Sequence, residues 1–156
     1  MRISLSASSA PLFYISTHGS LSSKPSIELT SSANPASPPL AHADLHRFSS
    51  DTDVAIFSPA IQKPSPLRPL LTTTFQKSRV FSTAHTFTIP IPNGRGSQTQ
   101  TFEWRSSSGP EVRALQGRSH GVKLVTAGGA VVAVWAPPMS GNNKKGKMAF
   151  MEGARE

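Results

Sequence analysis

The strongest structural signal in the chain lies in residues 122–135, which read VKLVTAGGAVVAVW. Two runs rich in β-branched residues flank Gly128 and Gly129. A glycine pair accepts the positive backbone φ angles of the tight turns whose twist matches that of paired strands. The stretch therefore predicts a β-hairpin. Pro137 and Pro138 end it, because proline has no N–H to donate to a strand ladder.

Outside this hairpin, the alternation of apolar and polar residues that is typical of half-buried strands recurs along the chain. It predicts strands at residues 12–17, 26–30, 40–48, 53–57, 86–89, 99–105 and 147–151. Residues 93–97, which read NGRGS, predict a turn, and residues 106–110 predict another. Residues 111–115 fit either one helical turn or a strand. We expect about eight short strands and no helix longer than two turns.

The predicted fold class is mainly β, as an antiparallel meander or an incomplete β-barrel. A length of 156 residues suits one domain. We expect a flexible N-terminus over residues 1–10, a single β domain over 11–151 with a Pro-rich loop at 61–71, and a flexible C-terminus over 152–156. The residues expected in the core are large apolar side chains of the predicted strands: Phe87, Phe102, Trp104, Leu124, Val134 and Trp135.

Composition excludes several classes of protein. Hydrophobic residues make up 37% and charged residues 15%, which excludes a coiled coil or a helical bundle. The absence of cysteine excludes disulfide scaffolds, thiolate zinc sites and cysteine nucleophiles. Sixteen Lys and Arg against eight Asp and Glu give a net charge of +8, which favours polyanionic partners. Only Lys144, Lys145 and Lys147 cluster, so they are the candidates for contact with an anionic surface.

The sequence offers little for catalysis. His42 and His46 would share one face of a helix as a metal pair, but in a strand they lie about 13 Å apart. No third metal ligand is spaced to help them apart from Asp44, which lies between them, so we interpret both as surface histidines. No Gly-x-Ser-x-Gly elbow occurs, and residues 93–96 lack the lysine and the helix of a P-loop. We predict a protein that is not an enzyme, with no catalytic residues, no metal ion and no cofactor.

Several stretches resemble a family of uncharacterised proteins from filamentous fungi. The resemblance is carried by residues 101–107 (TFEWRSS) with Gly109, Glu111 and Val112, by 121–125, 130–136, 12–17 and 24–27. The pattern of that family is similar to the tubby C-terminal and LURP-one-related fold, a β-barrel closed around a hydrophobic C-terminal helix. The resemblance implies a tubby-like β-barrel, and contact with phosphoinositide or other anionic lipid.

The last residues, 152–156, read EGARE and stand about where the resemblance implies a further strand and an apolar helix. A barrel without that helix leaves inward side chains in water. Exposing five large apolar side chains would cost on the order of 10 kcal/mol. We therefore expect a truncated reading frame, an oligomer that covers the open barrel, or an imperfect sheet.

The leading hypothesis is a non-enzymatic, tubby-like binding module that contacts anionic lipid or a protein partner. One alternative is a basic nucleic-acid-associated protein, which ranks second because the sequence has no RNP, zinc or helix-turn-helix signature. Another is a gene-prediction fragment without independent function. The longest apolar run, residues 130–136, is far shorter than the roughly 20 residues of a transmembrane helix. We expect a cytoplasmic protein, with the nucleus as an alternative and mitochondrial targeting by the Ser-rich start ranked lower.

Overall fold

The computed structural model consists almost entirely of β-strands. It describes residues 2–3, 12–19, 22–34, 37–46, 49–58, 68–78, 83–93, 96–139 and 146–151. These residues form eleven strands and one short helix, and each strand pairs antiparallel with its neighbours in the sequence. The predicted antiparallel meander is therefore confirmed. Contacts divide the chain into two compact units, unit 1 over Met1–Phe75 and unit 2 over Gln76–Glu156.

The division falls inside a strand that the sequence analysis missed, β6 (Leu71–Lys77). The first five residues of β6 pair with the preceding strand in unit 1, whereas only Gln76 and Lys77 pair with the following strand in unit 2. A meander makes most of its contacts between adjacent strands, so the chain divides where a paired stretch is this short. We missed β6 because three consecutive threonines, residues 72–74, interrupt its apolar alternation.

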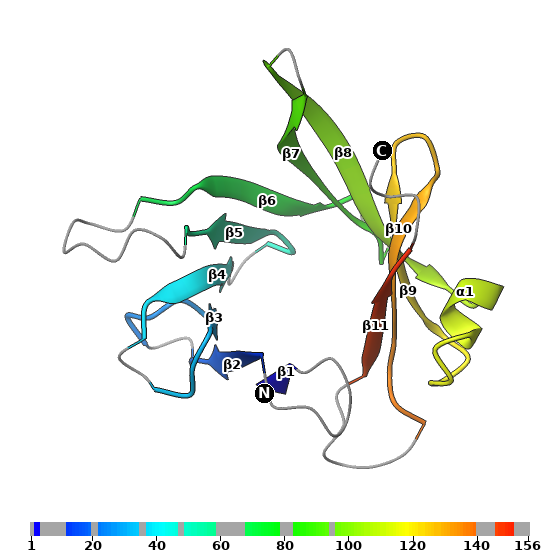
Figure 1. Cartoon of the computed structure of the whole chain (residues 1–156), viewed down its shortest axis with the longest axis horizontal. Coiled ribbons are helices and arrows are strands. Elements are labelled where there is room, and N and C mark those ends of the chain that lie inside the picture. Colours follow the sequence, from blue (N-terminus) through cyan, green and yellow to red (C-terminus); the bar gives the residue numbers. More distant parts are fainter. Residues whose placement is uncertain are drawn as a thin grey trace. The chain divides into compact units, whose positions relative to one another are not determined.

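Unit 1 is a ladder of short strands (Figure 1). Its strands are β1 (Arg2–Ile3), β2 (Phe13–Thr17), β3 (Ile27–Thr30), β4 (Pro39–Leu45), β5 (Thr52–Ile56) and the first part of β6. The predicted strand at 40–48 ends earlier, at Leu45, and begins at Pro39, because a first position needs no ladder N–H. Ala55 and Phe57 are the buried apolar residues of the described part of this unit.

Two expectations for unit 1 fall partly outside the described residues. Within the N-terminal stretch 1–10, Arg2 and Ile3 pair with Tyr14 and Phe13, so regular structure begins earlier than we predicted. The other residues of that stretch lie outside the described part of the chain. In the Pro-rich stretch 61–71, residues 61–67 also lie outside it, residues 68–70 form no strand, and Leu71 begins β6.

Unit 2 contains the hairpin that the sequence indicated most strongly. Its elements are the end of β6, β7 (His85–Asn93), β8 (Gly96–Ser107), α1 (Pro110–Arg113), β9 (Gly121–Thr126), β10 (Val131–Ala136) and β11 (Lys147–Phe150). β9 pairs with β10, and Gly129 takes a φ of 84° in the turn between them, which confirms the hairpin. β10 ends at Ala136, immediately before the two prolines.

The pair β7 and β8 is longer than predicted. Its register runs from His85 opposite Trp104 to Asn93 opposite Gly96, through Pro90 and Pro92, whereas the predicted strand ended at residue 89. Pro90 and Pro92 lie two residues apart, so their backbone nitrogens point to the same edge of β7. That edge faces away from β8, so the missing N–H groups leave the ladder with β8 intact.

The segment after β8 forms a helix rather than a turn. β8 extends to Ser107, so the turn predicted at 106–110 is shorter, and α1 settles the helix-or-strand alternative in favour of a helix. Pro110 is favourable in the first turn of a helix because the N–H it lacks has no partner there. Glu111, an acid in that first turn, adds a favourable interaction with the helix dipole.

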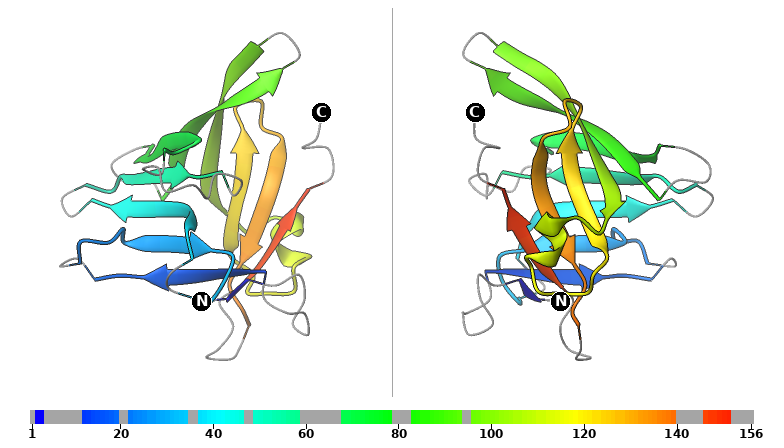
Figure 2. Two further views of the ribbon diagram at one scale, coloured as in Figure 1. Left: turned by 60° about the vertical axis from the view of Figure 1, so that its left-hand side comes forward. Right: turned by 90° about the vertical axis from the view of Figure 1, so that its right-hand side faces the viewer.

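The core of unit 2 has two clusters, on opposite faces of its ladder, because side chains alternate along each strand. Phe102, Leu124 and Ala133 form one, and half-buried Phe87 and Trp104 pack against it. The rings of Phe87 and Phe102 stack with centroids 5.5 Å apart. Val112 of α1 packs with Val134 and Ala136 in the other cluster, so α1 covers that face (Figure 2). Trp135, which we also expected in the core, is half-buried.

Candidate functional site

The positive charge of the chain is concentrated in unit 2. This unit has eleven Lys and Arg against four acids, a net charge of +7 for residues 76–156, which leaves +1 for residues 1–75. The electrostatic attraction that net positive charge exerts on polyanions is therefore stronger at unit 2 than at unit 1.

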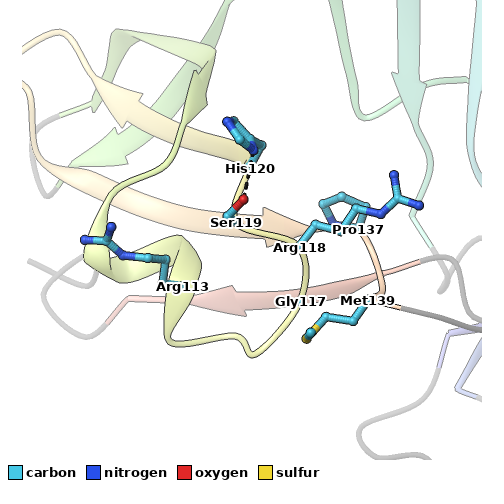
Figure 3. Close-up of a pocket in the computed structure, with 7 residues that line it drawn as sticks. All are labelled: Arg113, Gly117, Arg118, Ser119, His120, Pro137 and Met139. Carbon is cyan, nitrogen blue, oxygen red and sulfur yellow. Dashed lines mark hydrogen bonds between the residues drawn. The ribbon is translucent and has the colours of Figure 1, made fainter.

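An open hollow lies in unit 2 between the loop that follows α1 and the end of β10 (Figure 3). Its volume is about 630 Å³. The residues that line it combine positive, polar and apolar side chains: Arg113, Gly117, Arg118, Ser119, His120, Pro137 and Met139. These arginines give no signal in the sequence, because they are isolated cations there. The two arginines share a hollow with Pro137 and Met139 only because the loop that follows α1 folds back against the end of β10.

Two glycines and one hydrogen bond hold this loop against β10. A Cβ on Gly117 would lie 2.5 Å from the Pro137 carbonyl oxygen, and a Cβ on Gly121 would overlap the Trp135 carbonyl oxygen. The Arg118 N–H donates to the Pro137 carbonyl oxygen at 2.9 Å. Because only glycine permits such close backbone approach, these positions fix where the loop presents its side chains.

The cations at the hollow spread apart. Figure 3 shows the guanidinium groups of Arg113 and Arg118 pointing away from each other, with the His120 ring in a third direction. Ser119 Oγ lies 3.0 Å from His120 Nδ1, so these two polar groups satisfy one another. A tight site for one phosphate needs donors that converge on it. This arrangement instead suits a ligand whose negative charges are spread over a surface.

A partly buried ion pair fastens α1 to the sheet beside the hollow. Lys123 Nζ lies 3.0 Å from Glu111 Oε1, which also accepts from Ser107 Oγ at 3.3 Å. Hydrogen bonds from the backbone N–H of Glu111 and from Lys123 lower the pKa of the Glu111 carboxyl group. The carboxylate neutralises Lys123, whereas no acidic side chain in the described residues pairs with Arg113 or Arg118.

Of the three lysines predicted to contact an anionic surface, Lys144 and Lys145 lie outside the described residues. Lys147 is exposed and begins β11 opposite Ala136, the residue before Pro137 of the hollow. Residues paired across a ladder share a face, and Ala136 faces α1. Lys147 therefore belongs to the same face and the same end of unit 2 as the hollow. We call Arg113, Arg118 and Lys147 the basic end.

The histidines considered as a metal pair serve other contacts. β4 is a strand, as we expected for this segment, and the ring of His42 packs against Phe57 with centroids 5.1 Å apart. His42 is therefore half-buried rather than on the surface. His46 is exposed, and its Nε2 lies 2.9 Å from Asp53 Oδ2. In the part of the chain that the structure describes, no three His, Asp or Glu side chains are placed to hold a metal ion.

Asp44, the acid between these histidines, accepts a hydrogen bond from the Ser26 N–H at 3.2 Å. The turn with NGRG, considered as a phosphate cradle, includes Gly94 and Arg95, which lie outside the described residues. The hairpin β7–β8 that flanks it pairs through to Asn93 and Gly96.

Comparison with known proteins gives no relative. No family model, no curated protein and no solved structure matches the chain. Within the described ranges, no helix has the length and apolar character needed to cross a membrane.

Proposed function

We propose that this chain is a non-enzymatic binding module that contacts an anionic lipid surface through the basic end of unit 2. The observation that carries the proposal is that Arg113 and Arg118 line one open hollow, while Lys147 pairs with Ala136 at the same end of the unit. Two of them have no acidic partner among the described residues, so their charge remains available.

The spread of the cations favours a surface over a small ligand. A head-group layer has many negative charges, so diverging side chains can each meet a different one. Each Lys or Arg near such a surface contributes about 1 kcal/mol, so three contribute about 3 kcal/mol. Lys144 and Lys145, adjacent in sequence to Gly146 and Lys147, are expected to add to this attraction. The sequence resemblance to tubby-like proteins implies the same class of ligand.

The charge of unit 2 also keeps nucleic acid as the second candidate, because +7 attracts any polyanion. Binding to single-stranded nucleic acid would add base stacking on exposed aromatic side chains. Phe102 is buried, and Trp104 packs against the core that contains Phe102. The described aromatic residues of β8 thus form part of the core rather than a platform for bases.

Co-sedimentation with lipid vesicles tests the proposal. We expect the chain to sediment with vesicles containing phosphatidylserine and to stay in solution with pure phosphatidylcholine. Binding should weaken steeply between about 0.05 and about 0.5 M salt, because salt screens exposed charges. Equal recovery with both vesicles would contradict the proposal. Tighter, salt-sensitive binding to oligonucleotides than to the anionic vesicles would instead favour nucleic acid.

A further inference from the structure

One large apolar side chain stands in water at the rim of the hollow. Met139 is 72% exposed, and it lines the hollow together with the two arginines of α1 and the following loop. Single exposed apolar residues are common on protein surfaces, so exposure alone says little. The position of Met139, at a hollow that two arginines also line, is the informative feature.

The backbone that leads into Met139 is restrained. Pro137 and Pro138 precede it and fix their own φ angles. The Pro137 carbonyl oxygen accepts from the Arg118 N–H at 2.9 Å, which fastens the start of this segment to the loop. Met139 therefore follows a restrained stretch of backbone, and ordering that stretch on binding costs less conformational entropy.

Two cations belong to the same end of unit 2 as this side chain. Arg118 lines the same hollow, and Lys147 lies opposite Ala136, three residues before Met139. Cations at a bilayer surface sit at the level of the head groups, and an apolar side chain between them reaches the acyl boundary just below. Nucleic acid and free phosphate offer no such apolar layer.

We propose that Met139 is an apolar membrane anchor, which enters the acyl boundary of an anionic bilayer while the basic end contacts head groups. This inference rests on the proposed function and adds that binding has a component insensitive to salt. Transfer of one large apolar side chain from water into the bilayer should strengthen binding by roughly tenfold.

Tryptophan depth measurement tests the anchor directly. Met139→Trp is compared with Leu70→Trp, since Leu70 is 75% exposed but lies in unit 1. Both variants are mixed with anionic vesicles whose acyl chains are brominated, because bromine quenches the fluorescence of nearby indoles. The quenching measured for the wild-type chain, which comes from Trp104 and Trp135, is subtracted. We expect the added indole at 139 to be quenched several-fold more than that at 70.

A neutral substitution supplies the second measurement. Met139→Ser should weaken binding to anionic vesicles roughly tenfold and remove the part that persists at high salt. Met139→Leu, similar in volume and apolar, should bind like the wild type. If all these variants bind anionic vesicles equally and position 139 is not quenched, the anchor is wrong while the proposed function stands. If the wild type does not bind anionic vesicles, both fail together.

Discussion

Units 1 and 2 use the same arrangement of short antiparallel strands, yet they differ in packing and in charge. Two of the ten buried apolar residues in the described part of the chain lie in unit 1, and eight lie in unit 2. Unit 2 also has α1 over one face and a net charge of +7, against +1 in unit 1. The meander arrangement alone therefore determines neither how well a unit is packed nor which charge it presents. The segments between the strands, including α1, account for the difference between the two units.

The largest expected effect is loss of the better-packed core. Val134 is 1% exposed, and Val134→Asp would bury a charge without a partner, which should destabilise unit 2 by about 4 kcal/mol or more. Val54→Asp at a half-buried position of β5 should cost about 2 kcal/mol. During urea unfolding, tryptophan fluorescence reports on unit 2, which has both tryptophans. Tyrosine fluorescence reports on unit 1, which has Tyr14. Equal losses would contradict the difference in packing.

A smaller effect should follow from the close approach of the α1 loop to β10. Gly121→Ala would place a methyl group against the Trp135 carbonyl oxygen and 2.8 Å from Val112 Cγ1. We expect a loss of about 2 kcal/mol in the free energy of unfolding of unit 2. The matched variant is Gly19→Ala in unit 1, where a Cβ meets nothing within 4 Å and the change should be within about 0.5 kcal/mol. Equal stability of the two variants would refute the close approach.

The smallest effect concerns acid stability. The pKa of Glu111 is lowered below its ordinary 4.5, so its contribution is present above that pH and lost as the pH falls through the lowered value. Glu111→Gln should cost about 1 kcal/mol at neutral pH and progressively less in acid. The urea midpoint measured as a function of pH checks this. A constant difference down to strongly acidic pH would be inconsistent with the ion pair.

Asp53 in unit 1 provides the comparison. A hydrogen bond from Thr74 and the contact with His46 lower its pKa, but the side chain is 53% exposed, so solvent screens the charge. Asp53→Asn should therefore change the acid dependence less than Glu111→Gln.

The strands were predictable where β-branched runs flank a glycine pair, as in residues 122–135, or where apolar and polar residues alternate, as in residues 99–105. They were missed where the alternation fails, as at the threonines of β6, or where proline stands on an open edge, as at Pro90. The basic end was harder to predict. Arg113, Arg118 and Lys147 are 34 residues apart at most in the sequence, and only the pairing of β10 with β11 and the contact of Arg118 with Pro137 bring them together.

Of the basic end, the sequence indicated only Lys147, as a member of the cluster Lys144, Lys145 and Lys147. A run of like charges is visible in a sequence, whereas a site assembled from single cations depends on which strands are neighbours. Glycines at 117 and 121 were the available signal, because two glycines around a short basic loop indicate close backbone approach.

Vesicle affinity of paired charge variants tests the central claim, that unit 2 binds an anionic surface through its basic end. Arg113→Gln with Arg118→Gln and Lys24→Gln with Arg68→Gln remove the same charge from exposed positions of units 2 and 1, respectively. We predict about 30-fold weaker binding to phosphatidylserine vesicles for the first pair, and about wild-type affinity for the second. Equal weakening by both pairs would show that net charge alone attracts the chain, and would contradict a site in unit 2.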